Sequence, residues 1–184
     1  MKNFIVNTAI FLLFTSVFYI VCLSFWGRYA PSMFKPNINY KIGSYGHMYS
    51  RLAEIKNYSE IDILFLGSSH AYRGFDTRIF LENGYKTFNL GSSAQTPAQT
   101  KVLLNRYLDD LNPKIVIYEV YPETFTIDGV ESSLDIIAND LNDLHSLKMA
   151  LKINNIKTYN TILYGFTRDF LGLNESFIEK KIKG

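Results

Sequence analysis

The chain is poor in the residues that most often reveal a protein's chemistry. It has one cysteine, Cys22, so no disulfide can form within it. Its three histidines form no cluster with other metal-binding residues, and it has no Walker loop and no Gly-x-Gly-x-x-Gly turn. Lys and Arg number 19 against 17 Asp and Glu, a net charge of +2 that gives no reason to expect nucleic acid. We therefore expect no metal, no cofactor and no nucleic-acid partner.

Charge is also missing near the N-terminus, where residues 4–26 form a run of 23 uncharged residues between Lys2 and Arg28. At about 1.5 Å per helical residue, this run is long enough to cross roughly 30 Å of hydrocarbon. The alternative is a cleaved signal peptide, whose apolar region is shorter and ends in small residues, whereas this one ends in Trp26. We therefore predict a single-pass membrane anchor over residues 1–27, with a cytoplasmic N-terminus and the domain outside the cytoplasm.

Residues 28–58 are expected to form a juxtamembrane linker followed by a short helix. Helix-breaking residues interrupt the first part of this segment, at Pro31, Pro36 and Gly43. The second part, residues 45–58, carries apolar residues at helical spacing, namely Met48, Leu52 and Ile55. The remainder, residues 59–184, is predicted to be one α/β domain.

The first half of that domain alternates between strand and helix signals. The order is strand, helix, strand, helix, strand, over residues 61–66, 77–83, 86–90, 97–111 and 114–120. Asp76 can cap the first helix, and Thr96-Pro97 is a strong start for the second, which is expected to bury Leu104, Leu108 and Leu111. This order predicts a right-handed βαβαβ unit with a parallel sheet. The ends of its three strands then face one crevice.

The second half has helical patterns only. Apolar residues at three–four spacing predict a long amphipathic helix over residues 132–151, and residues 160–173 predict a shorter one. No fourth strand is visible, and three strands are few for this architecture. We therefore expect the sheet to be incomplete and the chain to be the front part of a larger domain.

The turn after the first strand holds a candidate nucleophile, Ser69, which follows Gly67. A serine nucleophile needs an exposed turn, a base within hydrogen-bond reach and backbone N–H donors for the oxyanion. Small residues at Gly91 and its neighbours can supply such donors. A base is harder to find, because His70 is adjacent to Ser69 and His145 lies on the predicted amphipathic helix.

These turns resemble blocks of the SGNH/GDSL hydrolase superfamily. Gly67-Ser68-Ser69 resembles the first block, usually Gly-Asp-Ser, which places the nucleophile at Ser69. Residues 89–94 look like the second block, so the resemblance implies an oxyanion hole made by Ser69, Gly91 and Ala94. It further implies a three-layer, flavodoxin-like fold. Ser68, His70 and Arg73 become residues that could orient the site, although Arg73 can instead bind an anion or pair with Asp76. Glu119 and Glu123 follow the third strand toward the crevice and could orient it too.

The third turn, Tyr121-Pro122-Glu123-Thr124-Phe125, resembles a stretch of the membrane-anchored branch that includes teichoic-acid D-alanylation and alginate O-acetylation proteins. The family's last block, Asp-x-x-His, is absent, and the stretch ending in His145 comes closest, with asparagine at the aspartate position. We therefore expect either a fragment or a degenerate member.

The resemblance implies a bacterial serine esterase or acyltransferase that acts on acyl groups of cell-surface glycans. Its partners would be the membrane, a surface polysaccharide and a membrane acyltransferase. The alternatives are a non-catalytic tethered module of the same fold and a truncated product without activity.

Overall fold

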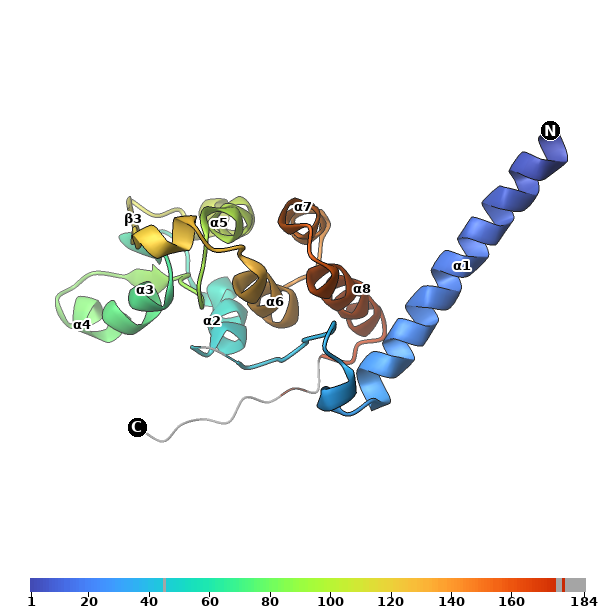
Figure 1. Ribbon diagram of the computed structural model, residues 1–184. Coiled ribbons are helices and arrows are strands. Elements are labelled where there is room, and N and C mark those ends of the chain that lie inside the picture. The colour runs from blue at the N-terminus through green and yellow to red at the C-terminus, as the bar shows by residue number, and fades with distance from the viewer. Residues whose placement is uncertain (45, 175–176, 178–184) are drawn as a thin grey trace.

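The computed structural model describes residues 1–44, 46–174 and 177, and shows an α/β domain from which one long helix projects (Figure 1). Two sequence-based expectations extend beyond these residues: Tyr45, at the start of the predicted short helix, and residues 175–176 and 178–184 of the predicted domain. The sheet is parallel and has three strands within the described residues. The predicted α/β class is therefore confirmed.

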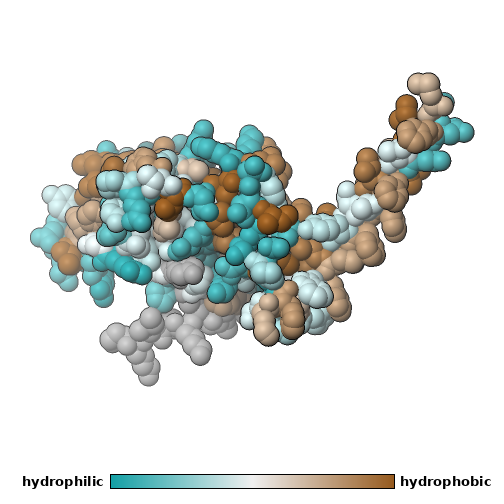
Figure 2. Space-filling model, in the orientation of Figure 1, coloured by the Kyte–Doolittle hydropathy of each residue, from teal (hydrophilic) through white to brown (hydrophobic). Residues whose placement is uncertain are grey.

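The projecting helix, α1 (Lys2–Tyr29), is long and apolar enough to cross a membrane. Its apolar side chains are exposed along most of its length (Figure 2). Only its last turns touch the domain, where Leu23 and Gly27 are buried. A side chain at position 27 would collide with the ring of Tyr164, 2.7 Å from the place of a Cβ, so glycine permits the close approach of α1 to the domain.

The sheet has the strand order β2-β1-β3, with β1 (Ile63–Leu66) between β2 (Thr87–Asn89) and β3 (Ile115–Tyr118). Leu64 of β1 is in register with Phe88 on one side and with Val116 on the other. All four residues of β1 are buried, as expected for an apolar strand in the middle of a parallel sheet.

The third strand differs from the first because it lies at an edge. Ile115 and Val116 of β3 are 55% and 44% exposed, and no strand pairs with the outer side of β3 among the described residues. An apolar sequence alone predicted the strand correctly, but it did not distinguish a central strand from an exposed edge.

The helices predicted before the first strand and after the turns of the first two strands are present, and a short helix, α3 (Ser69–Gly74), forms where a turn was expected after β1. The others are α2 (Met48–Glu54), α4 (Thr77–Glu82) and α5 (Pro97–Leu111), with 3₁₀ turns at Ser32–Phe34, Ile55–Asn57 and Pro122–Phe125. Asp76 caps α4, and Thr96 forms a capping box with Gln99 at the start of α5. The expected core face of α5 was partly wrong: Val102, Leu103 and Leu111 are buried, whereas Leu108 is 37% exposed.

The long helix expected over residues 132–151 is wrong, because the structure has two helices there. These are α6 (Val130–Asn139) and α7 (Leu144–Ile153), followed by α8 (Ile156–Phe170). Asp140 leaves the helical conformation, and Asp143 caps α7 through a capping box with Ser146. The apolar spacing continues across the break, so this spacing alone did not indicate that the helix ends. The polar residues between the helices, which include the cap of α7, are the local sign of the break.

Arg106 of α5 holds this break in place. Its guanidinium donates to Asp140 and Asp143, with each closest N–O distance 2.6 Å, and its side chain is only 6% exposed. Burial alone would raise the pKa of Asp143, but the hydrogen bonds from Arg106 and from the Ser146 backbone, together with the charge of Arg106, outweigh burial and lower this pKa to about 2. Arg106 also donates to Ser146, and the Tyr107 hydroxyl donates to Asp140. One buried cation therefore joins α5 to the α6–α7 connection.

We predict that Arg106→Ala lowers the free energy of unfolding by about 3–5 kcal/mol, because it leaves two partly buried carboxylates without their cation. Urea unfolding of the detergent-solubilised protein measures this change. Lys101→Ala on the exposed side of the same helix is the control and should change it by less than about 0.5 kcal/mol. Equal effects of the two variants would contradict the role given to Arg106.

Candidate functional site

Strand β1 ends at Gly67 in a conformation that requires glycine. Its φ of +140° is unfavourable for residues with a side chain, and a Cβ there would lie 2.7 Å from both Cβ and Oε2 of Glu119. The carboxyl ends of β1 and β3 are therefore in direct contact, next to the turn that follows β1. This close approach fixes where the serines at positions 68 and 69 lie.

Ser68 is buried and its hydroxyl is fully engaged. The hydroxyl donates to Glu119 Oε2 at 2.8 Å, and the backbone N–H of Ser68 donates to the same oxygen at 2.8 Å. Since the proton of the hydroxyl is used there, Ser68 Oγ accepts from the ring Nδ1 of His70 at 3.1 Å and from the His70 backbone N–H at 3.3 Å. Ser68 therefore caps α3 and anchors the turn.

Ser69, the predicted nucleophile, is the first residue of α3 and is partly exposed. Among the described residues, no side chain forms a hydrogen bond with its hydroxyl and no acceptor takes its backbone N–H. Ser69 thus has the exposure and the free amide that a nucleophile turn needs. It lacks a base within the part of the chain that the structure describes.

The turn after β2 packs against the turn after β1. Ser92 N–H donates to the carbonyl of Gly67 at 3.1 Å, while Gly91 N–H donates to the side chain of Asn89 at 2.9 Å. The Gly91 amide is therefore already used. Ala94 has a φ of +48°, which glycine usually adopts, and its N–H has no acceptor among the described residues. Of the three expected oxyanion donors, Ser69 and Ala94 have free amides.

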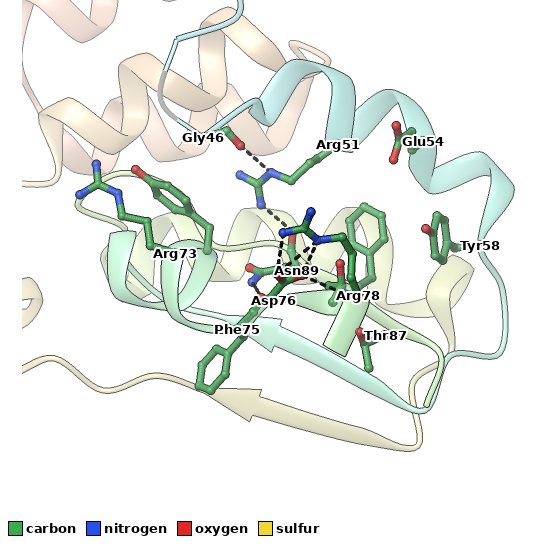
Figure 3. A pocket seen from close by; sticks show the side chains of 13 residues that line it. Gly46, Arg51, Glu54, Tyr58, Arg73, Phe75, Asp76, Arg78, Thr87 and Asn89 are labelled. Atoms are coloured by element: carbon green, nitrogen blue, oxygen red, sulfur yellow. Dashed lines mark hydrogen bonds and ion pairs between the residues drawn. The ribbon is translucent and has the colours of Figure 1, made fainter. Parts of the chain in front are cut away.

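Arg51 of α2 binds the turn after β2 through backbone carbonyls. Its guanidinium donates to the carbonyls of Asn89 and Gly91 at 2.6 and 2.8 Å, and to the carbonyl of Gly46 at 2.9 Å (Figure 3). The carbonyls of Asn89 and Gly91 lie at the carboxyl end of β2, so Arg51 holds this strand end against α2. This role could not be predicted from the sequence, because Arg51 lies in a short helix far from any motif.

The turn after β3 contributes Glu119 rather than Glu123. Glu119 reaches Ser68, whereas Glu123 accepts a hydrogen bond from the hydroxyl of Tyr121 at 2.7 Å, in an exposed position. The ring of Tyr121 lies 4.6 Å from the ring of His70, centroid to centroid. Glu119 is the first residue after β3, and this placement is the signal that singles it out over Glu123.

None of the three histidines lies within hydrogen-bond reach of the Ser69 hydroxyl. His70 turns toward Ser68 and Tyr121. His145 borders a small cavity of about 160 Å³ between α5 and α7, in company with Lys101, Lys148 and Lys152. Asp143, near it in sequence, is bound by Arg106. The stretch that resembled the Asp-x-x-His block most closely is therefore a helix cap in this structure.

A polar cavity of about 310 Å³ lies on the other side of α3, between α2, α4 and β2 (Figure 3). Ser68 and Ser69 do not line it. Arg73 lies at its edge with its guanidinium 5.4 Å from the centre of the Tyr72 ring. The expected pairing of Arg73 with Asp76 is wrong, because Asp76 binds Arg78 at 2.7 Å.

One buried carboxyl group, that of Asp135, was not predicted from the sequence. Asp135 of α6 is 2% exposed, its Oδ1 accepts a hydrogen bond from Asn139, and its Oδ2 has no hydrogen-bond partner among the described residues. Burial raises the pKa of Asp135 to about 7, although the nearby backbone N–H of Ser93, the charge of Arg51 and the Asn139 amide lower it. Asp135 belongs to no motif and lies within the stretch predicted to be an amphipathic helix, so nothing in the sequence indicated its burial.

No group of three His, Cys, Asp or Glu in the described residues could hold a metal ion. No protein-family model, curated protein or solved structure matches the chain. The resemblance to SGNH hydrolases therefore stands on the short motifs alone.

We predict that Glu119→Gln lowers the free energy of unfolding by about 1–2 kcal/mol, because it removes the charge that strengthens two hydrogen bonds to Ser68. Glu123→Gln is the matched control and should change it by less than about 0.5 kcal/mol. Denaturant unfolding measures both. A double-mutant cycle of Ser68→Ala with Glu119→Ala should give a coupling of about 1 kcal/mol or more, and additive effects would contradict the contact.

We predict that Asp135→Asn changes the pH dependence of stability. With a pKa of about 7 in the folded state and a lower one when unfolded, Asp135 binds more protons in the folded protein between about pH 4 and pH 7, so stability falls as pH rises through this range. The variant should be more stable than the natural protein by roughly 2–4 kcal/mol near pH 8, and the difference should vanish near pH 4. Parallel curves across this range would contradict the buried, protonated state.

Proposed function

We propose that this chain is a membrane-anchored serine esterase or acyltransferase of the SGNH type, acting on acyl groups of cell-surface glycans. The observation that carries the proposal is the meeting of three strand ends around a partly exposed serine at the end of the central strand. Ligands of open α/β sheets bind at this edge. The strand order β2-β1-β3 is also the order with which flavodoxin-like sheets begin, which supports the finer fold assignment.

In this proposal, Ser69 Oγ attacks the carbonyl carbon of an acyl ester and a base takes the hydroxyl proton. The amides of Ser69 and Ala94 stabilise the negative oxygen of the tetrahedral intermediate. The sugar hydroxyl then leaves with a proton, and an acyl group remains bound to Ser69. Water or a second hydroxyl releases the acyl group in the next step. The base must come from outside the described residues, since no described histidine lies beside the Ser69 hydroxyl.

We also propose where the protein is located. Helix α1 anchors the protein in the membrane, with the N-terminus in the cytoplasm and the domain outside it. This arrangement holds the crevice near the membrane, where a surface polysaccharide and a membrane-bound acyl donor or acyltransferase can reach it.

A specific observation favours a second candidate, a non-catalytic module of the same fold. The carboxylate and the imidazole closest to the turn both contact Ser68, which is buried and caps a helix, and neither contacts Ser69. In that case the crevice binds a glycan without cleaving an ester bond.

A serine-directed fluorophosphonate probe separates the two. In membranes of cells that make the natural protein, we expect the probe to label it, because an activated serine attacks phosphorus as it attacks an acyl carbon. Ser69→Ala should abolish the label. Ser93→Ala, which removes another serine at the same crevice, should keep it. No labelling of the natural protein, or labelling that survives Ser69→Ala, would reject Ser69 as the nucleophile.

A further inference from the structure

An open cavity of about 630 Å³ lies where the anchor meets the domain. Its walls come from the end of α1, from the linker that follows α1, and from α8, which Figure 1 shows side by side. Hydrogen bonds from Tyr19 to Asn160 at 2.7 Å and from Ser24 to Thr167 at 3.1 Å join α1 to α8, and the N–H of Asn39, in the linker, donates to Thr161 of α8 at 3.1 Å. The cavity is therefore part of a defined junction between α1 and α8.

The charges that line this cavity are all positive. They belong to Arg28, Lys35, Lys41, Lys157 and Arg168, and no Asp or Glu is among the described lining residues. Within the described part of the chain, none of these five side chains forms an ion pair with a carboxylate. Asp169 lies close to the cavity wall, but its carboxylate accepts hydrogen bonds from Asn142 and Asn174 and it is not a lining residue. Asp128, Glu131 and Asp135 line the neighbouring cavity, with which this one shares Lys41 and Lys157. Five cations with no lining carboxylate make a site for an anion.

Two of the five cations are held in place before any ligand arrives. The Arg168 guanidinium donates to the carbonyl of Leu173 and lies between the rings of Tyr40 and Tyr164, 5.1 and 5.7 Å from their centres. Lys35 Nζ donates to the carbonyl of Gly27 at 3.0 Å and keeps two further protons for a ligand. Their positions are therefore set by the fold, which lowers the entropy lost on binding.

The cavity also lies at a defined depth relative to the anchor. Gly27 and Arg28 follow directly after the uncharged run that ends in Trp26, so they lie where an anchor of this length leaves the hydrocarbon and enters the headgroup layer. Basic pockets at this level bind the phosphate groups of anionic lipids.

We propose that this cavity binds a phosphate group presented by an anionic phospholipid headgroup. The proposal rests on the membrane location given under the proposed function and is independent of any chemistry at Ser69. Binding would fix the orientation of the domain on the membrane, because the cavity joins α1, the linker and α8. The crevice would then face the surface at a constant height.

Trp26 allows a direct test, because it is the chain's single tryptophan and lies beside the cavity, with its Nε1–H donating to the carbonyl of Phe34 at 3.0 Å. The full chain in detergent is titrated with dioctanoyl phosphatidylglycerol, dioctanoyl phosphatidylcholine or inorganic phosphate while tryptophan fluorescence is recorded. We expect a saturable change with phosphatidylglycerol, and a change at least about tenfold weaker with phosphatidylcholine, since each Lys near a lipid phosphate contributes about 1 kcal/mol.

Matched variants locate the site. Lys41→Gln with Lys157→Gln should weaken phosphatidylglycerol binding about tenfold or more, whereas Lys148→Gln with Lys152→Gln on α7 should leave it unchanged. Thermal unfolding without lipid should be the same for both pairs, which shows that the fold is intact.

Ser69→Ala should bind like the natural protein, so a failure of the catalytic proposal leaves this test unaffected. Equal binding of the two lipids, equal effects of the two pairs, or saturation by inorganic phosphate at the same concentration would overturn the proposal.

Discussion

The contact between Gly67 and Glu119 is the constraint on which the site depends. The Glu119 side chain occupies the space that a side chain at position 67 would need, and its carboxylate accepts both donors of Ser68. Together with the Glu119 N–H, which donates to the carbonyl of Leu66 at 2.9 Å, this contact joins the ends of β1 and β3 at the point where the chain leaves the sheet and α3 starts at Ser69. Because Ser68 is held on the inner side, Ser69 is left partly exposed at the edge of the sheet, with its hydroxyl and its amide unpaired among the described residues.

Further polar contacts link the serine turn to the rest of the domain. Arg51 binds the carbonyls that end β2, and the Ser92 amide ties that turn to Gly67. Arg106 binds the connection between α6 and α7, on which α8 packs. Helix α8 in turn holds the end of α1. Two arginines that bind carbonyls and carboxylates, together with the hydrogen bonds between α8 and α1, therefore connect the crevice to the anchor, while the apolar core fills the space between them.

The two functional proposals occupy opposite ends of this arrangement. The serine crevice lies at the carboxyl ends of the strands, and the basic cavity lies at the junction of α1 and α8. An enzyme acting on glycans at a membrane surface needs both features, a nucleophile in a crevice and a fixed position relative to the lipid. The free amides of Ser69 and Ala94 fit acyl chemistry, and the absence of a histidine beside Ser69 in the described residues leaves a base still to be supplied.

Elements with local signals could be predicted from the amino-acid sequence alone. The uncharged run predicted α1, Asp76 and Thr96-Pro97 predicted the starts of α4 and α5, and apolar runs predicted the three parallel strands. Such signals depend on hydrophobic period and on caps, which neighbouring residues set. Tertiary structure decided what depends on residues far apart in the chain. It ended α6 before α7 because Arg106 binds the residues between them, and left β3 at an edge. It placed Glu119 rather than Glu123 at the serine turn, since the position of β3 beside β1 decides which carboxylate reaches Ser68.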